Sequence, residues 1–429
     1  MKKHLQKILS TEFNKAVITL LSGTALAQLI TFALYPFISR LYTPADFGVF
    51  GLITSILGIV ALVATTRYEL AIILPASDEE AGHVFSLSLL INLIVSALSL
   101  LVIFLFFILM DDMGASLNQH KKILFLIPVL VFFTSASNII QNWLIRKKDY
   151  KALSKSKIIQ SFFNNGLIII LGWLSIGVLG LFYGLLVSLM VTVFYLYNKF
   201  IKSTGNDRIA FDTVAMKRVA KKYIDFPKAN TFQALSESFQ SQGIIFFISY
   251  YFSMQIVGLY SFALRILMAP LYFFVNSFTQ VFYQTASEQY AQGISLVPIL
   301  KKTVSNLVLL AFPLMVLLMT AGPSLFSFVF GEEWRESGVY ARLLAPYICI
   351  DFIRYGISQL PIILGKVRPM FYWSLIGNIV LFSSLLIGIL FFNDLKTGFM
   401  MVSCAMTVYF GLLFTWIYKL AKNERNRQA

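Results

Sequence analysis

Residues 84–109 read VFSLSLLINLIVSALSLLVIFLFFIL and contain no charged side chain. A helix of about 20 apolar residues is long enough to cross the hydrocarbon core of a bilayer, so this stretch predicts a transmembrane helix. Similar stretches recur at short intervals along the chain. We predict about twelve spans, at residues 16–38, 47–64, 84–109, 123–145, 158–174, 178–197, 231–252, 256–280, 299–320, 339–364, 370–392 and 399–418. The sequence therefore predicts an all-α integral membrane protein.

The composition supports this assignment. The 429 residues are 58% hydrophobic and 13% charged, with a mean hydropathy of +0.76. Soluble domains carry about a quarter charged residues, so this chain cannot cover itself with polar surface. Its basic start, residues 1–15, resembles a signal peptide. The apolar run that follows is longer than a signal's core and lacks a small-residue cleavage site, so we assign it as the first span.

Basic residues are distributed unevenly over the predicted loops. With the N-terminus in the cytoplasm, the inner segments hold 27 Lys and Arg residues and the outer side holds 6. By the positive-inside rule, this asymmetry predicts that both termini are cytoplasmic. The net charge of +15 is therefore interpreted as a topology signal rather than as a nucleic-acid-binding surface.

The longest inner segment divides the spans into two groups of six. We predict an N-lobe at residues 1–198, a cytoplasmic linker at residues 199–229 and a C-lobe with a basic tail at residues 230–429. Residues 211–226 of the linker mix apolar and basic side chains, as expected of an amphipathic helix at the anionic inner surface of a membrane.

An internal repeat supports the division. A shift of 210 residues aligns residues 47–50, FGVF, with residues 257–260, VGLY, and aligns ASD at 76–78 with ASE at 286–288. Because six spans is an even number, both halves enter the membrane from the same side. Transporters built in this way bind substrate between their halves. We therefore expect two six-helix lobes around a central cavity.

Polar side chains recur inside the spans at steps of three or four residues, which places them on single helix faces. Such residues are costly in a bilayer and usually face a bundle interior or a water-filled cavity. The stripes are Thr24, Gln28, Thr31 and Tyr35 in the first span; Thr134, Asn138 and Gln141 in the fourth; Asn230, Gln233, Glu237 and Gln240 in the seventh; Arg265, Tyr272, Asn276 and Gln280 in the eighth; and Tyr347, Asp351, Arg354 and Ser358 in the tenth.

These stripes supply the candidate site. Arginine recognises phosphate by charge and by its planar donor fork, so Arg265 and Arg354 are candidates for binding an anionic cargo. Gln233, Asn276 and Gln280 are candidates for contacts with its hydroxyl groups. The alternative is that polar side chains hold helices together or form structural ion pairs.

The remaining candidates have acidic side chains or lie at span ends. Glu237 and Asp351 are predicted to couple an ion or to form structural ion pairs, and Asp351 can pair with Arg354 one turn away. Arg67 and Glu69 follow the second span and are assigned to a cytoplasmic gate.

Features of other functional classes are missing from the sequence. No Gly-rich loop ending in Gly-Lys-Ser/Thr predicts ATP binding, and no Cys/His group has metal-ligand spacing. No long outer loop offers a site for an enzyme of glycan assembly. We therefore expect no catalytic residues, no cofactor and no metal.

The chain resembles the polysaccharide-biosynthesis flippases of the O-antigen type, in the superfamily that includes the multidrug and toxin extrusion transporters. The motifs that carry this resemblance are RLYTPADFG at 40–48, RYELAI at 67–72, DFPK at 225–228, VGLY at 257–260 and FGEEW at 330–334.

The resemblance implies a transporter of the bacterial inner membrane. It implies a two-lobed bundle that moves undecaprenyl-diphosphate-linked oligosaccharide, such as an O-antigen or lipopolysaccharide repeat unit, by ion-coupled alternating access. Membrane lipids and glycan polymerases are the implied partners, and nucleic acid is not. Cavity arginines are the family's recurrent functional residues, which adds Arg40 to Arg265 and Arg354. An exporter of small amphipathic compounds and a membrane enzyme of glycan assembly stay as alternatives.

Overall fold

A computed structural model describes residues 12–109, 121–204 and 211–428. Within these ranges the chain is helical and contains no strand, and twelve helices have 21 residues or more. Each of the twelve predicted spans overlaps one of these helices. The prediction of an all-α fold with about twelve long helices is therefore confirmed.

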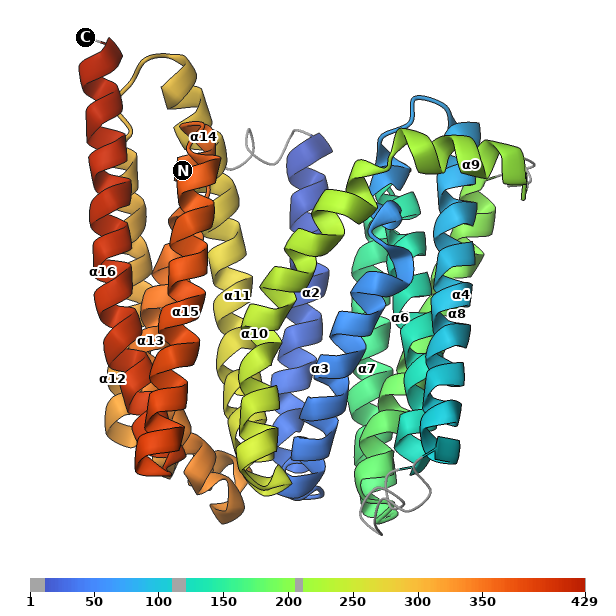
Figure 1. Ribbon diagram of the computed structural model, residues 1–429, viewed down its shortest axis with the longest axis horizontal. Coiled ribbons are helices and arrows are strands. Elements are labelled where there is room, and N and C mark those ends of the chain that lie inside the picture. Colours follow the sequence, from blue (N-terminus) through green and yellow to red (C-terminus); the bar gives the residue numbers. More distant parts are fainter. Residues whose placement is uncertain (1–11, 110–120, 205–210, 429) are drawn as a thin grey trace. The chain divides into compact units, whose positions relative to one another are not determined.

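The chain divides into two compact units, Met1–Ser249 and Tyr250–Ala429. The long helices of the first unit are α2 (Glu12–Ile38), α3 (Pro44–Thr65), α4 (Asp78–Leu109), α6 (Lys121–Arg146), α7 (Tyr150–Trp173), α8 (Val178–Thr204) and α10 (Thr231–Tyr251), which ends at the boundary. Those of the second unit are α11 (Met254–Ala291), α12 (Val297–Phe330), α13 (Arg335–Ile357), α15 (Val367–Phe392) and α16 (Leu395–Gln428) (Figure 1).

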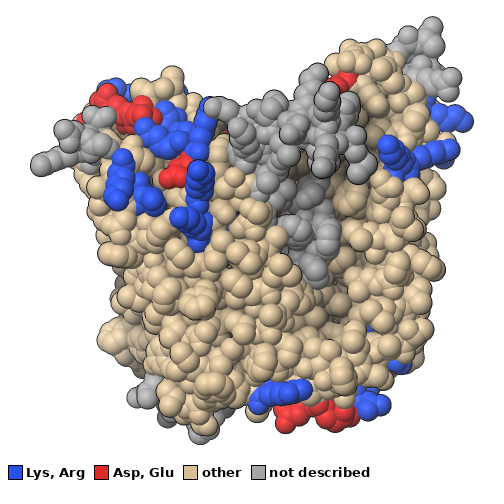
Figure 2. All heavy atoms as spheres, turned by 180° about the vertical axis from the view of Figure 1, so that it is seen from behind, with Lys and Arg blue, Asp and Glu red and all other residues tan. Residues whose placement is uncertain are grey.

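Seven of these helices are long and apolar enough to cross a membrane by length and composition: α3, α4, α6, α8, α12, α15 and α16. Of the other long helices, α2, α7, α10, α11 and α13, two contain shorter apolar segments among the described residues, Ser22–Ile38 in α2 and Met254–Met268 in α11. All but α7 contain a polar stripe identified in the sequence. On the face seen in Figure 2, most charged side chains gather toward the top and the bottom, with a band of uncharged residues between them. The chain is a multi-pass membrane protein.

The internal repeat has a structural counterpart in each unit. Thr43 is the N-cap of α3 and Ser253 is the N-cap of α11, 210 residues later. In the first unit the rings of Phe50 and Phe182 lie 5.2 Å apart between α3 and α8. In the second unit the rings of Tyr260 and Phe399 lie at the same distance between α11 and α16. Equivalent helices thus make an aromatic contact in both units, although the ring planes meet at 63° in the first and at 21° in the second.

The tenth predicted span is shorter than the sequence indicated. Residues 339–364 were expected to form one helix, but α13 ends at Ile357 and a short helix, α14 (Leu360–Ile363), follows. Pro361 has no N–H to donate to the carbonyl of Ile357, and its ring would clash with that carbonyl in a continuous α-helix. The proline therefore ends α13.

The linker helix packs on the first unit. The connection contains α9 (Thr213–Lys222) and a π-helical turn, η2 (Phe226–Asn230), before α10. Met216 and Val219 of α9 are buried, and Val219 joins the apolar core formed by α4, α6 and α8. Lys222 donates to Glu80 of α4 at 2.5 Å, and α9 lies across the end of α4 (Figure 1). These two apolar side chains are thus turned to protein, while Val214, Lys217, Arg218 and Lys221 stay exposed.

Candidate functional site

An ion pair on α13 forms the best-defined polar group among the predicted site residues. Nε of Arg354 donates to Oδ1 of Asp351 at 2.6 Å, three residues earlier on the same helix face. The arginine side chain is 25% exposed and the aspartate side chain 18%. The predicted Asp351–Arg354 pairing is therefore present, and the pair is still reachable.

One aromatic ring of α16 lies next to the Arg354 guanidinium. Its central carbon lies 5.7 Å from the ring centroid of Phe410, a distance at which a cation is attracted to the ring face. Phe410 is buried and stacks on Tyr347 of α13, with ring planes 2° apart. Within the described residues the two terminal nitrogens of Arg354 make no hydrogen bond, so a positioned donor fork is left for an anion.

The register of α11 against α13 fixes the positions of the two candidate arginines along the helix axes. The Ser337 hydroxyl donates to the carbonyl of Leu259 at 2.8 Å, and the Thr279 hydroxyl donates to the carbonyl of Tyr355 at 3.3 Å. The helices therefore run in the same direction. At 1.5 Å per residue, half-buried Arg265 lies roughly 15–20 Å from Arg354 along the helix axes.

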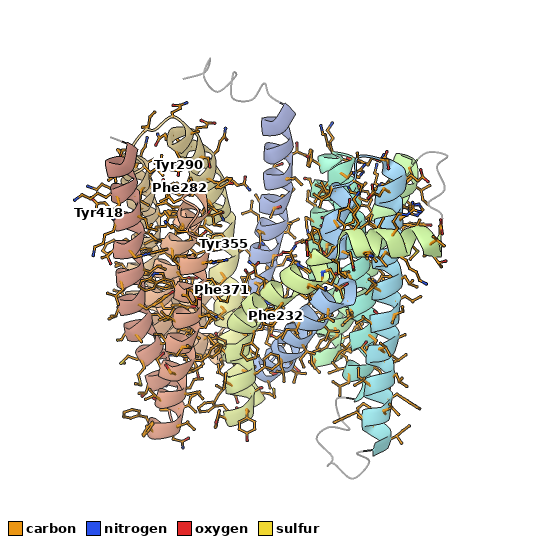
Figure 3. The ribbon with its side chains drawn as sticks, turned by 45° about the horizontal axis from the view of Figure 1, so that its top comes forward. Phe232, Phe282, Tyr290, Tyr355, Phe371 and Tyr418 are labelled. Carbon is orange, nitrogen blue, oxygen red and sulfur yellow. The ribbon has the colours of Figure 1, made fainter. Side chains whose placement is uncertain are left out.

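The same register gives the level of Gln280, one of the two α11 residues predicted to contact the cargo. Exposed Gln280 directly follows Thr279, so it lies at the level of Tyr355 and Arg354 (Tyr355 is labelled in Figure 3). The side chain of Asn276 lies outside the described residues. Arg354 and Gln280 are thus at one level, and Arg265 is at another.

The polar stripe on α10 contains a hydrogen bond between two of its own side chains. Nε2 of Gln233 donates to Oε1 of Glu237 at 3.1 Å, and both side chains are exposed. Glu237 makes no ion pair with the described residues, so the structural-ion-pair alternative has no partner there. The side chain of Gln240 lies outside the described residues. Gln242 accepts a hydrogen bond from Ser55 of α3 at 2.8 Å, which ties α10 to α3.

The predicted gate residues lie in the connection between α3 and α4. Arg67 Nη1 lies 3.8 Å from Glu69 Oε1, and the Glu69 side chain is only 6% exposed. Glu69 belongs to the short helix η1 (Tyr68–Ile73), whose Tyr68 hydroxyl donates to the carbonyl of Ala220 in α9 at 2.9 Å. The predicted pair is therefore close, and it lies next to the linker helix.

This connection is locally strained. Thr66 and Arg67 are consecutive residues with φ of 45° and 63°, a left-handed region that non-glycine and above all β-branched residues avoid. Burial raises the pKa of Glu69, and a hydrogen bond from Thr65 and the charge of Arg67 oppose that shift only in part. Arg40, by contrast, is exposed in the turn between α2 and α3.

Part of the polar stripe on α2 forms hydrogen bonds to α7. Oγ of Ser161 on α7 lies 3.0 Å from Oγ1 of Thr31, and Nδ2 of Asn165 donates to the same threonine at 3.1 Å. Tyr35 is buried against Phe47. For Thr31, the alternative of a helix-to-helix contact is therefore correct.

Sequence reasoning missed one basic residue of the first unit. The fifth span was predicted to begin at residue 158, which assigned Lys157 to a loop. In the structure α7 begins at Tyr150, so Lys157 lies two turns inside the helix, with an exposed side chain. The signal was present in the sequence, because Lys157, Gln160 and Asn164 follow one another at steps of three and four residues.

The family model described as "Polysaccharide biosynthesis protein" matches residues 37–339. The chain belongs to this polysaccharide biosynthesis family. The matched region contains α3 and its capping motif, the Arg67–Glu69 connection, α10, α11 and the start of α13. A search of curated proteins found no match.

Solved membrane transporters share the fold. An inward-facing multidrug resistance MATE family transporter of the MOP superfamily is similar over 96% of this chain and 99% of its own, with a TM-score of 0.67 and 16% identity. The lipid II flippase MurJ, in an inward closed conformation, is similar over 95% of this chain and 90% of its own, with a TM-score of 0.68 and 15% identity. A MOP superfamily transporter from Pyrococcus furiosus gives a TM-score of 0.52 at 16% identity, over 96% of each chain. The chain thus belongs to a polysaccharide biosynthesis family and shares its fold with these solved transporters.

Proposed function

We propose that this protein is a flippase that carries undecaprenyl-diphosphate-linked oligosaccharide across the bacterial inner membrane, by alternating access between two lobes. The observation that carries the proposal is the Arg354 group: a guanidinium fixed by Asp351 and Phe410 on a long helix of a polysaccharide biosynthesis protein, with its terminal nitrogens accessible. An O-antigen or similar lipopolysaccharide repeat unit is the expected cargo. Glycan polymerases are the proposed protein partners.

The chemistry of the cargo explains why such a group is needed. A diphosphate-sugar head carries charge and many hydroxyl groups, and its transfer through hydrocarbon without partners would be prohibitively costly. Arg354 would bind the diphosphate, and Gln280 at the same level would bind hydroxyl groups. The polyprenyl tail would stay in the lipid. Arg265 lies farther along α11 and would receive the head at a second level of the path.

A proposed coupling role falls to Glu237. It is an exposed carboxylate on α10 whose hydrogen-bond partner is the uncharged Gln233, and no described residue pairs with it as a cation. Such a carboxylate can bind a proton or a sodium ion without first breaking an ion pair. Arg67 and Glu69, on the connection next to the linker helix, are proposed as the cytoplasmic gate.

The proposal is tested by deleting the gene and analysing the lipid-linked intermediates. We expect surface glycan to be lost and the complete lipid-linked repeat unit to accumulate in the inner leaflet of the inner membrane. Complementation with the wild-type chain should reverse both effects. Accumulation of an incomplete repeat unit would instead indicate an enzyme of glycan assembly, and unchanged intermediates would refute the flippase proposal.

A second candidate is an ion-coupled exporter of small amphipathic compounds, which the similarity to a multidrug transporter favours. It predicts that deletion sensitises cells to amphipathic toxic cations and leaves lipid-linked intermediates unchanged. The terminal nitrogens of Arg354 favour an anionic cargo over a cationic one, because guanidinium N–H groups can only donate hydrogen bonds.

A further inference from the structure

The connection between α3 and α4, residues 66–77, is anchored to other elements of the first unit at both of its ends. Nη1 of Arg146 on α6 donates to the carbonyl of Pro75 at 2.6 Å. Near the start of the connection, the hydroxyl of buried Tyr68 donates to the carbonyl of Ala220 on α9 at 2.9 Å. The connection therefore links the helix bundle to the linker helix.

Within this connection, a base and a buried acid lie close together without a hydrogen bond between them. Nη1 of Arg67 and Oε1 of Glu69 are 3.8 Å apart, which is beyond hydrogen-bond distance. Nε of Arg67 and Oε2 of Glu69 are buried, and neither has a hydrogen-bond partner among the described residues. An ionised carboxylate held in this way would leave a charged acceptor unsatisfied, which is costly. The observed arrangement therefore suits the protonated, uncharged acid.

Charged groups on the neighbouring elements are engaged with one another or exposed. Helices α4, α6 and η2 contact η1, and Tyr68 reaches α9. The titratable and charged side chains of these elements near the connection are Asp78, which pairs with Arg146 and Lys147; Glu80, which contacts Lys222 and Tyr223; Glu79 and His83, which lie 4.0 Å apart; and Lys217, Arg218, Lys221, Asp225 and Lys228, which are exposed. The charge of Arg67 acts on Glu69, but it opposes only in part the rise in pKa that burial causes. The protonation of Glu69 is thus governed by its burial rather than by a close ion pair.

The backbone beside Glu69 is strained and can relax. Thr66 and Arg67 are held in the left-handed region, with φ of 45° and 63°. Strain of this kind persists only where the surroundings hold it, and it is common in switching segments. Ionisation of Glu69 would draw Arg67 toward a direct, charge-assisted hydrogen bond. That movement would shift the backbone next to Tyr68 and so disturb its contact with α9.

We propose that Glu69 is a proton-controlled latch between the 66–77 connection and the linker helix. With the carboxyl protonated, Tyr68 stays on Ala220 and α9 is held. When the carboxyl loses its proton to water, the connection rearranges toward an Arg67–Glu69 hydrogen bond and Tyr68 leaves α9. Since η2 and α10 follow α9 in the chain, this release frees the start of the helix that contains Glu237. The inference rests on the proposed cytoplasmic gate and adds its control by protons.

The test measures hydrogen exchange of backbone amides by mass spectrometry. Purified full-length protein in detergent is compared between about pH 4 and 8, after correction for the intrinsic pH dependence of exchange. In the wild type, protection of residues 66–77 and 213–222 should fall severalfold as the pH rises through the raised pKa of Glu69. A tenfold fall corresponds to a pKa that differs by about one between the held and released arrangements.

Two variants at neighbouring glutamates identify the titrating group. Glu69→Gln cannot ionise, so protection of both segments should keep its low-pH value across the whole range. Glu79→Gln is the matched control, because the Glu79 side chain is 88% exposed, and it should behave as the wild type.

A third variant tests the contact with the linker helix. Tyr68→Phe keeps the ring and removes the hydroxyl that reaches Ala220. Protection of residues 66–77 should still depend on pH in this variant, whereas that of residues 213–222 should no longer do so. If both segments kept the wild-type pH dependence, the Tyr68 contact would not transmit the change, and the latch would be refuted.

The remaining outcomes are equally decisive. Protection that is independent of pH in the wild type would overturn the proposal, as would a pH dependence that persists in Glu69→Gln or disappears in Glu79→Gln. An equal change over all helices would indicate global destabilisation and would also overturn it. None of these measurements uses cargo, so the deletion experiment tests the flippase proposal separately: accumulation of the complete repeat unit with pH-independent protection would refute the latch alone.

Discussion

Nε of Arg354 donates to Oδ1 of Asp351 at 2.6 Å, while the central carbon of its guanidinium lies 5.7 Å from the ring centroid of Phe410. The aspartate and the ring fix the arginine from two directions without enclosing it. A group held in this way loses little conformational freedom when an anion binds, which favours affinity.

The first prediction concerns this arginine. Arg354→Ala should lower surface glycan by about tenfold or more, because the variant loses a charged donor to the diphosphate. Immunoblots of surface glycan and of the protein in isolated membranes are the measurements. Arg335→Ala is the control, since Arg335 begins the same helix and is 59% exposed in its pair with Glu332. Wild-type glycan in Arg354→Ala, at equal protein level, would refute the cargo-binding role.

The second prediction concerns Arg265, at the other level of α11. Arg265→Ala should also reduce surface glycan, and Arg265→Lys should retain more activity than Arg265→Ala because it keeps the charge. Trapping the cargo by cross-linking would show whether it still reaches the Arg354 level in Arg265→Ala. Full activity of Arg265→Ala would assign this residue to structure alone.

The third prediction concerns coupling. Glu237→Gln keeps the size of the side chain and removes the charge, so transport should lose its dependence on the proton or sodium gradient. Uptake of cargo by inverted vesicles under imposed gradients measures this dependence. Glu288→Gln is a matched control, because Gln284 donates to Glu288 at 3.1 Å in the same four-residue spacing on α11. An unchanged gradient dependence in Glu237→Gln would exclude it as the coupling carboxylate.

The fourth prediction concerns pH. Burial raises the pKa of Glu69 above its ordinary value of 4.5, so the folded state favours the protonated carboxyl. The stabilisation that the protonated Glu69 carboxyl contributes is therefore complete below about pH 4.5 and is lost as the pH rises through the raised pKa. Glutamine does not ionise, so the Glu69→Gln variant should keep this stabilisation at neutral pH and have a higher Tm there than the wild type. Thermal unfolding in detergent between about pH 4 and 8 tests this, with the highly exposed Glu79→Gln as a control. A lower Tm for Glu69→Gln at neutral pH would contradict it.

The fifth prediction concerns helix packing in the second unit. A Cβ on Gly338 of α13 would lie 2.5 Å from the carbonyl oxygen of Gly322 in α12, and backbone cannot move aside as a side chain can. Gly338→Ala should therefore destabilise the protein by about 1–3 kcal/mol, seen as a lower Tm in detergent. Gly411→Ala on α16 should cause no loss, because a Cβ there meets nothing within 4 Å. Equal Tm values for the two variants would show that α12 and α13 can separate at little cost.

The sequence by itself determined the class of fold and the positions of its long helices. The reason is that a bilayer demands long apolar helices with internally paired backbones, so hydropathy alone locates them. It also determined the Asp351–Arg354 pair and the shared helix face of Gln233 and Glu237, because residues three or four apart on a helix are neighbours wherever the helix lies. The predicted lobe boundaries, the cytoplasmic termini and the central cavity stay predictions.

Only the tertiary structure decided how polar residues on different helices are combined. Thr31 joins α2 to α7, Arg265 and Arg354 lie at different levels, and Lys157 belongs to a helix rather than to a loop. These facts depend on helix register and on where α7 begins, which close contacts such as that of Gly23 with Ser154 fix across distant parts of the chain. The spacing of residues along one helix cannot predict the register between two helices, because that register is set by the shape of the neighbouring helix.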